Sequence, residues 1–357
     1  MNRKIIRFEN YKIEEKSKFT RNSTMQRARF SFVMVVSAVV LAALPAVRGR
    51  KCEKKDVFYK STLILFTNYN KANIPNDCTE LELGLGSLGD HGAVAVAAAL
   101  TNNTRVTRVA LYNNDIGKKG AAALADMLKI NSRLESLNLD HNKIGNKGLK
   151  LLAEGLKVNT HLSSLDLEAN EIKDTGATAL AEALKVNTAL VQLDLDSNRI
   201  QDDGISAIAG ALKVNAGSKL AMLALMANKF GDEGTIELAE ALKVSKVIQE
   251  LGLDTNKIGN DGATALAAAL KVNGVLTTLG LIENKIGDPG AIAIAEALKV
   301  NQVLETLDVE DNYFGPKGIA AFMDAVKVNK VLHELDLDDF NKIRKAQKAG
   351  TNWNVNN

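Results

Sequence analysis

The sequence predicts an α/β solenoid, with parallel strands on its concave face and helices on its convex face. Three features that recur about every 28 residues predict it: a glycine, a short leucine alternation before that glycine, and an asparagine between them. Units of this size bury their apolar faces only by stacking on one another. The recurring glycines are Gly92, Gly120, Gly148, Gly176, Gly204, Gly234, Gly262, Gly290 and Gly318.

The leucine alternation predicts a strand at the start of each repeat. In Leu193-Asp194-Leu195, apolar and polar residues alternate, as expected for a strand with one buried face. An asparagine follows where the chain must turn, and its amide can satisfy backbone N–H and C=O groups there. The recurring asparagines are Asn114, Asn142, Asn170, Asn198, Asn228, Asn256, Asn284 and Asn312.

The segment after each glycine predicts a helix. Between Ala177 and Lys185, apolar residues fall at helical spacing, and the small ones allow close packing on the strands. The single 30-residue step between glycines places two extra residues in the turn-rich stretch 215–219. An insertion in such a turn costs little.

This pattern resembles the ribonuclease-inhibitor-like class of leucine-rich repeats. The match L-x-x-L-x-L-x-x-N-x-I-x-x-x-G followed by A-x-x-L-A-x-A-L covers residues 78–345, about ten repeats. Ribonuclease inhibitor, NOD-like receptor repeat regions and Ran GTPase-activating protein share it. The resemblance implies a horseshoe-shaped leucine-rich-repeat solenoid. It implies little about function, because one scaffold serves many partners.

The first 49 residues differ from the rest in charge and hydropathy. They hold ten Lys/Arg against Glu9, Glu14 and Glu15, a surplus of +7, so the remainder of this +3 chain is about −4. That acidity disfavours nucleic acid as a partner. Residues 30–47 are uncharged and follow Arg27 and Arg29, which predicts a signal peptide and a secreted or lumenal protein. The alternative is a retained membrane anchor at 30–47, and translation starts at either Met1 or Met25.

These features divide the chain into four segments. Residues 1–49 form the leader, 50–77 an N-terminal cap, 78–345 the repeats and 346–357 a polar tail. Cys52 and Cys78 are the only cysteines, and in a secreted chain such a pair predicts a disulfide; two buried free thiols are the alternative. Asn102 begins an N-x-T glycosylation sequon.

Acidic residues concentrate at the strand positions that face the concave side. Equivalent positions of adjacent repeats lie about 5 Å apart, and stacked like charges repel by roughly 0.2–1 kcal/mol per pair. Folding alone gives no reason to prefer such repulsion, so these positions predict a binding surface for a basic protein. The predicted partner-binding residues are Asp140, Asp166, Glu168, Asp194, Asp196, Met226, Asp254, Ile282, Asp308, Glu310, Asp336 and Asp338.

Other motifs are better explained by the repeat. Residues 84–89 spell G-x-G-x-x-G, but Leu88 and the following Gly92 stand in repeat register, and the next strand lacks an acid for a ribose. Asp194-x-Asp196-x-Asn198 lacks the glycine and distal glutamate of a calcium loop. No two of the four histidines have metal-ligand spacing. We therefore predict no metal, no cofactor and no catalytic residue.

The sequence thus predicts a non-catalytic, monomeric protein-interaction module. A GTPase-activating protein of the Ran type is one alternative, since that family shares the repeat. A membrane-anchored receptor or sensor repeat domain is another, and it depends on whether residues 30–47 are retained.

Overall fold

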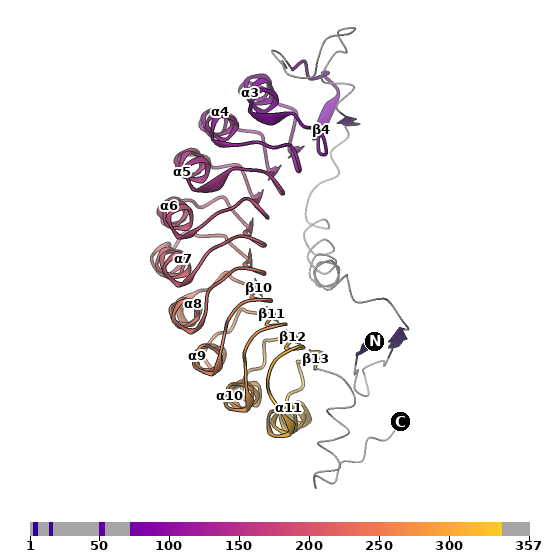
Figure 1. Ribbon diagram of the computed structural model, residues 1–357, viewed down its shortest axis with the longest axis vertical. Helices are drawn as coiled ribbons and strands as arrows, with labels where there is room; N and C mark the ends of the chain where they lie inside the picture. Colours follow the sequence, from indigo (N-terminus) through magenta and orange to yellow (C-terminus); the bar gives the residue numbers. More distant parts are fainter. Residues whose placement is uncertain (1–2, 6–13, 17–49, 54–71, 338–357) are drawn as a thin grey trace.

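A computed structural model describes residues 3–5, 14–16, 50–53 and 72–337. Its main sheet has 11 parallel strands in the order β13-β12-β11-β10-β9-β8-β7-β6-β5-β4-β3, so each strand lies beside the next one along the chain. Figure 1 shows a curved stack with the strands on the inside and one helix per repeat outside. The predicted α/β leucine-rich-repeat solenoid is confirmed.

The strands are short, and the helices between them are much longer. The strand bounds are β3 Arg50–Glu53, β4 Cys78–Glu82, β5 Arg108–Ala110, β6 Ser136–Asn138, β7 Ser164–Asp166, β8 Gln192–Asp194, β9 Met222–Ala224, β10 Glu250–Gly252, β11 Thr278–Gly280, β12 Thr306–Asp308 and β13 Glu334–Asp336. The helix bounds are α3 Gly89–Leu100, α4 Lys118–Leu128, α5 Gly145–Leu156, α6 Asp174–Leu184, α7 Asp202–Val214, α8 Asp232–Val244, α9 Asn260–Leu270, α10 Asp288–Leu298 and α11 Pro316–Val328. A separate antiparallel pair joins β1 (Arg3–Ile5) to β2 (Glu14–Lys16).

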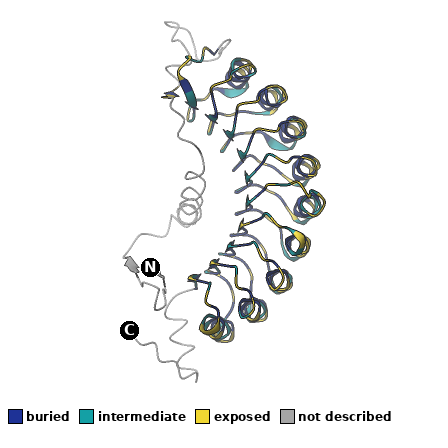
Figure 2. Cartoon of the chain, turned by 180° about the vertical axis from the view of Figure 1, so that it is seen from behind, coloured by how far each residue is buried: buried dark blue, intermediate teal, exposed yellow. Residues whose placement is uncertain are grey.

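One buried residue from each strand forms the spine of the core; it is a leucine in β4 and in β6 to β13, Val109 in β5 and Cys52 in β3. Leu165 pairs with Leu193 in register, and both are almost completely buried. The helices contribute alanines and leucines from their inner faces, such as Ala181 and Leu180 of α6. Figure 2 shows this buried layer continuing from repeat to repeat between the strands and the helices. The core is therefore continuous along the stack.

The predicted asparagine series is buried at the strand ends and bonds across repeats. Asn198 donates from Nδ2 to the carbonyl of Leu167 in the preceding repeat and to that of Leu195 in its own, both at 3.0 Å. Its Oδ1 accepts the N–H of Asn170 and of Ile172 at 3.0 and 2.9 Å. Each amide thus satisfies backbone groups that the turn would otherwise leave unpaired in the core.

A second asparagine series, which we did not predict, does the same at the helix ends. Asn187 donates to the carbonyl of Leu156 at 2.7 Å and accepts the N–H of Leu190 at 2.9 Å. Its equivalents are Asn131, Asn159, Asn215, Asn273, Asn301 and Asn329. In one repeat the position is taken by Ser245, which has no amide to donate.

A disulfide joins the N-terminal cap to the first repeat. Cys52 in β3 and Cys78 in β4 are both completely buried, and their Cα atoms lie 5.7 Å apart. Arg50 adds an ion pair with Asp77, with Nε 2.7 Å from Oδ2. The cap therefore covers the open edge of the sheet with a covalently attached strand.

Within the described ranges, no helix combines the length and the apolar character that crossing a membrane requires. The predicted signal or anchor segment 30–47 lies outside those ranges, as does the tail 346–357.

Candidate protein-binding face

Each repeat presents three outward-facing positions on the concave side, two in the strand and one just after it. In the β7 repeat these are Ser164, Asp166 and Glu168, which alternate with the buried Leu165 and Leu167. Parallel pairing in register places equivalent residues side by side, so Asp166 pairs with Asp194 of β8. The concave face is therefore built from three rows of side chains that run along the stack.

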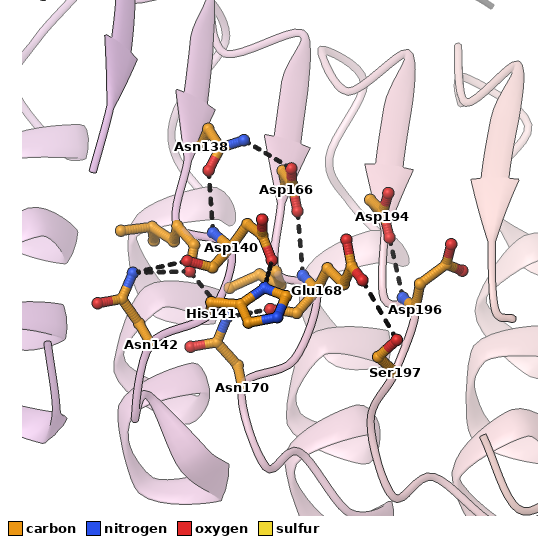
Figure 3. Close-up of polar contacts among 12 residues, drawn as sticks. Asn138, Asp140, His141, Asn142, Asp166, Glu168, Asn170, Asp194, Asp196 and Ser197 are labelled. Carbon is orange, nitrogen blue, oxygen red and sulfur yellow. Dashed lines mark hydrogen bonds and ion pairs between the residues drawn. The ribbon is translucent and has the colours of Figure 1, made fainter. Parts of the chain in front are cut away.

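The predicted acidic residues form two groups on this face. We call Asp140, Asp166, Glu168, Asp194 and Asp196 the central acidic cluster; Figure 3 shows these side chains together on neighbouring strands. Asp308, Glu310 and Asp336 lie on β12 and β13 or just after them. Between the two groups lie Met226, Asp254 and Ile282. The remaining predicted residue, Asp338, lies outside the described residues.

Several of these carboxylates accept backbone N–H groups, which gives them a role in the fold. Asp166 Oδ1 accepts the N–H of Glu168 at 3.0 Å, and Asp194 Oδ1 accepts that of Asp196 at 2.9 Å. Asn138 makes the same contact with the N–H of Asp140 at 3.0 Å. Each strand ends two residues before this N–H, so the N–H needs an acceptor outside the strand ladder.

Four repeats have no side-chain acceptor at this position, which is occupied by Ala110, Ala224, Gly252 and Gly280. In the repeats of Ala224 and Gly280, an aspartate from the preceding repeat accepts the N–H instead. Asp196 Oδ1 lies 2.6 Å from the nitrogen of Met226, and Asp254 Oδ1 lies 2.7 Å from that of Ile282. Our expectation that folding gives no reason for these acids is therefore wrong.

Burial and mutual repulsion both act on the carboxylates. Burial, reinforced by the charge of Asp194, raises the pKa of Asp166 and of Asp196 well above the usual range. Burial raises the pKa of Asp254 to about 6. Burial, with repulsion from Asp336, raises the pKa of Asp308 well above the usual range. Bringing a cation to this face would therefore stabilise the ionised carboxylates.

The predicted residues differ in how much of each side chain a partner can reach. Asp196 and Asp254 are only 7% and 4% exposed, since both fold onto the neighbouring strand. Asp140, Asp166, Asp194, Asp308, Glu310 and Asp336 are all partly exposed. Met226 is buried, whereas Ile282 is partly exposed. The accessible part of the face is therefore acidic, with a narrow apolar middle.

Among the described residues, Lys and Arg meet this face only near its N-terminal end. Arg108 Nη1 lies 2.9 Å from Glu80 Oε1, and Lys51 Nζ lies 2.9 Å from Glu82 Oε2. From β6 to β13, the three concave positions of each repeat hold no lysine or arginine up to Asp336. The negative potential is therefore concentrated over the middle and the C-terminal part of the horseshoe.

His141 belongs to this site and was not predicted. It lies beside the central acidic cluster, with its Nδ1 in contact with Asp140 Oδ1. Adjacent residues of a strand point to opposite faces, so strand alternation does not predict that the two side chains meet. Away from the concave face, Asn102 of the predicted sequon is exposed in the turn after α3.

The strictly sequential order of the parallel strands, with every helix on the same side of the sheet (Figure 1), is the arrangement of a repeat solenoid. A family model described as "Leucine Rich repeat" matches residues 102–125, 131–153, 158–181, 186–209, 244–267, 272–295 and 300–323. The chain is a leucine-rich-repeat protein.

Comparison with solved structures gives matches that include the following two. The "Leiomodin-1 Actin-Binding Site 2 (ABS2)" structure is 28% identical, with 38% of this chain and 80% of that chain covered and a TM-score of 0.34. The Rad7–Elc1 complex in yeast is 16% identical, with 77% of this chain and 68% of that chain covered and a TM-score of 0.48. Comparison with curated proteins gives no match.

Proposed function

We propose that the concave face binds a basic segment of a protein partner and that the chain is a non-catalytic interaction module. The observation that carries this proposal is the charge pattern. From β6 to Asp336, every ionisable side chain at the three concave positions is a carboxylate. The 28-residue period and full helices also fit the ribonuclease-inhibitor-like class of the family.

The backbone role of these acids does not account for their charge. Asn138 accepts the N–H of Asp140 with a neutral amide, which carries no repulsion. Asp166 and Asp194 do the same task with charged groups, in register on adjacent strands. A neutral acceptor would fold at lower electrostatic cost, so the charge at these positions favours a role in binding.

The acidic zones and the apolar middle together favour one kind of ligand. Lysine or arginine side chains of the partner would lie against the central acidic cluster and against Asp308 and Asp336. An apolar side chain between them would contact Met222 and Ile282, which are partly exposed. Buried apolar contact contributes affinity, and charge complementarity contributes orientation and association rate.

Four substitutions that keep side-chain size test this proposal. Asp166→Asn, Glu168→Gln, Asp194→Asn and Asp336→Asn together remove four charges from the concave face. The matched control removes four charges from the helices, where each glutamate pairs with a lysine three residues later. It carries Glu154→Gln, Glu182→Gln, Glu240→Gln and Glu296→Gln.

Proteins that bind the immobilised full chain are captured and purified. Their affinity is then measured for the native chain and for both variants. The concave variant should bind at least tenfold more weakly and lose most of its salt dependence, while the control binds normally. Equal binding by both variants would exclude the concave face. Acceleration of GTP hydrolysis by a Ran-type GTPase would instead support the GTPase-activating alternative.

Secretion as a monomer is part of the proposal. The Cys52–Cys78 disulfide and the exposed Asn102 both suit an oxidising, glycosylating compartment. N-terminal sequencing of the mature protein should find a start near Arg50, whereas retention of residues 30–47 would favour the membrane-anchored receptor. Light scattering of the purified protein should give the mass of one chain.

A further inference from the structure

We propose that Asp140, His141 and Glu168 bind a divalent first-row transition-metal ion on the concave face. One nitrogen and two carboxylate oxygens from these residues lie within 4.8 Å of one another. This site is independent of the proposed protein partner, because metal binding can be measured on the isolated chain.

The backbone brings two adjacent residues to the same side. His141 has a φ of 52°, in the left-handed region that non-glycine residues seldom adopt. This conformation ends the alternation of the strand, so the imidazole folds back and its Nδ1 meets Asp140 Oδ1. Figure 3 shows His141 between Asp140 and Glu168.

The third ligand comes from the next repeat and is held there by several contacts. The N–H of His141 donates to the carbonyl of Glu168 at 2.9 Å, which ties the two turns together. Ser197 Oγ donates to Glu168 Oε1 at 3.2 Å, and Asp166 Oδ1 accepts the Glu168 N–H at 3.0 Å. Glu168 is only 8% exposed, so its carboxylate is a buried group oriented among other acids. Contacts behind the ligands, like these, fix them for a metal.

The mixed set of donors determines which ions suit the site. Calcium and magnesium prefer oxygen ligands alone, whereas an imidazole with carboxylates suits zinc, cobalt, iron or nickel. A tetrahedral ion with bonds of about 2.1 Å needs ligand atoms about 3.4 Å apart, so the side chains need move only by about 1 Å. Three protein ligands leave a position for water or for a side chain of a partner.

The surroundings favour a cation there, and only one repeat has the imidazole. Asp166 in the same repeat as Glu168, and Asp194 paired with Asp166 on the next strand, add negative charge beside the three ligands (Figure 3). A divalent ion would reduce the repulsion among these charges. Equivalent positions to His141 in the other described repeats carry Leu85, Asn113, Ala169, Ser197, Ala227, Thr255, Glu283 and Asp311.

The chain contains four histidines, so the site can be tested by calorimetry and by imidazole NMR. Titration of the full chain with Zn²⁺ should give one ion per chain and shift the ring proton resonances of His141. Titration with Co²⁺ should produce visible absorption bands. His141→Ala and Glu168→Gln should each weaken zinc binding at least tenfold, in line with the loss of a ligand. His161→Ala, at an exposed histidine beside Thr160, is the control and should bind normally.

Zinc binding that is unchanged in His141→Ala would overturn the proposal. So would calcium binding as tight as zinc binding, because acids alone would then hold the ion. His141 is exposed, so His141→Ala leaves no cavity in the core. This variant therefore tests zinc binding at the site even if Glu168→Gln fails to fold. Circular dichroism checks the fold of each variant.

Discussion

Asp202 caps a helix that belongs to the next repeat. Its Oδ1 accepts the N–H of Gly231 at 2.8 Å and that of Gly234 at 2.9 Å, both at the start of α8. Asp174 makes the equivalent bonds to Gln201 and Gly204, at 2.6 and 3.2 Å. The first turn of a helix leaves N–H groups unpaired, and here the preceding repeat supplies the acceptor. Helix capping therefore stabilises the contact between repeats as well as the helix.

Asp202→Ala should lower the free energy of unfolding by about 1–2 kcal/mol, the usual cost of losing a cap. The neighbouring Asp203 in the same first turn is exposed, and within the described residues it accepts no helix N–H. Asp203→Ala should therefore cost only a few tenths of a kcal/mol, from its interaction with the helix dipole. Urea unfolding measures both variants, and equal losses would argue against capping between repeats.

The repeat pattern could predict the order of strands and helices, because apolar spacing distinguishes the two within one 28-residue unit. It also identified the asparagines after the strands. An asparagine recurs there in each repeat, and the buried turn needs both a donor and an acceptor, as Asn198 shows. The series around Asn187 was missed. An asparagine after a helix is equally suited to an exposed turn, and only the carbonyl of the preceding repeat shows that it is buried.

The candidate site was predicted less completely than the fold. The concave acids were found from alternation, but the separate role of Asp196 depends on Ala224 in the next strand. A register comparison could have suggested it, because a repeat without a polar residue at that position leaves an N–H that an aspartate of the preceding repeat can reach. The contact between His141 and Asp140 depends on one left-handed backbone angle, which residue spacing does not reveal.

Ser245 marks the weakest point of the second asparagine series. Its Oγ lies 3.4 and 3.3 Å from the nitrogens of Val247 and Ile248. In the next repeat, Asn273 Oδ1 accepts the corresponding N–H groups, those of Val275 and Leu276, both at 2.8 Å. Asn273 also donates to the carbonyl of Leu242 at 2.7 Å.

Ser245→Asn should add these bonds and raise the free energy of unfolding by about 1 kcal/mol. The reverse change, Asn273→Ser, should lower it by about 1–2 kcal/mol, because buried backbone groups lose their partner. Both are measured by urea unfolding. If neither variant changes stability, the amide bonds between repeats contribute nothing net.

Removing the disulfide should loosen one end of the solenoid and leave the other unchanged. The bond closes a loop with a sequence separation of 26, for which loss of the cross-link costs about 3 kcal/mol. In a repeat protein this cost falls on the nearest units. Hydrogen exchange in Cys52→Ser/Cys78→Ser should quicken in β4 and α3 and stay the same in α10. Equal acceleration in both regions would mean that the stack unfolds as one unit.

Asp254 gives a prediction whose size depends on pH. Burial raises its pKa to about 6 from an ordinary value of 3.8, so the folded chain keeps a proton that the unfolded chain releases between these values. Stability from this group is therefore greatest below pH 3.8 and is lost as the pH rises through 6. At pH 7 the buried charge costs about 3 kcal/mol.

Asp254→Asn keeps an oxygen for the N–H of Ile282, which now lies 2.7 Å from Oδ1, and removes the charge. The variant should be more stable than the native chain at pH 7, by about 3 kcal/mol, and this difference should shrink towards zero by pH 4. The other carboxylates are present in both the native chain and the variant, so their contribution to the pH dependence of stability largely cancels in the comparison. The exposed Asp261 in the first turn of α9 is the control, and Asp261→Asn should show no such gain. A difference that did not vary between pH 4 and pH 7 would show that the ionised carboxylate is not penalised in the fold.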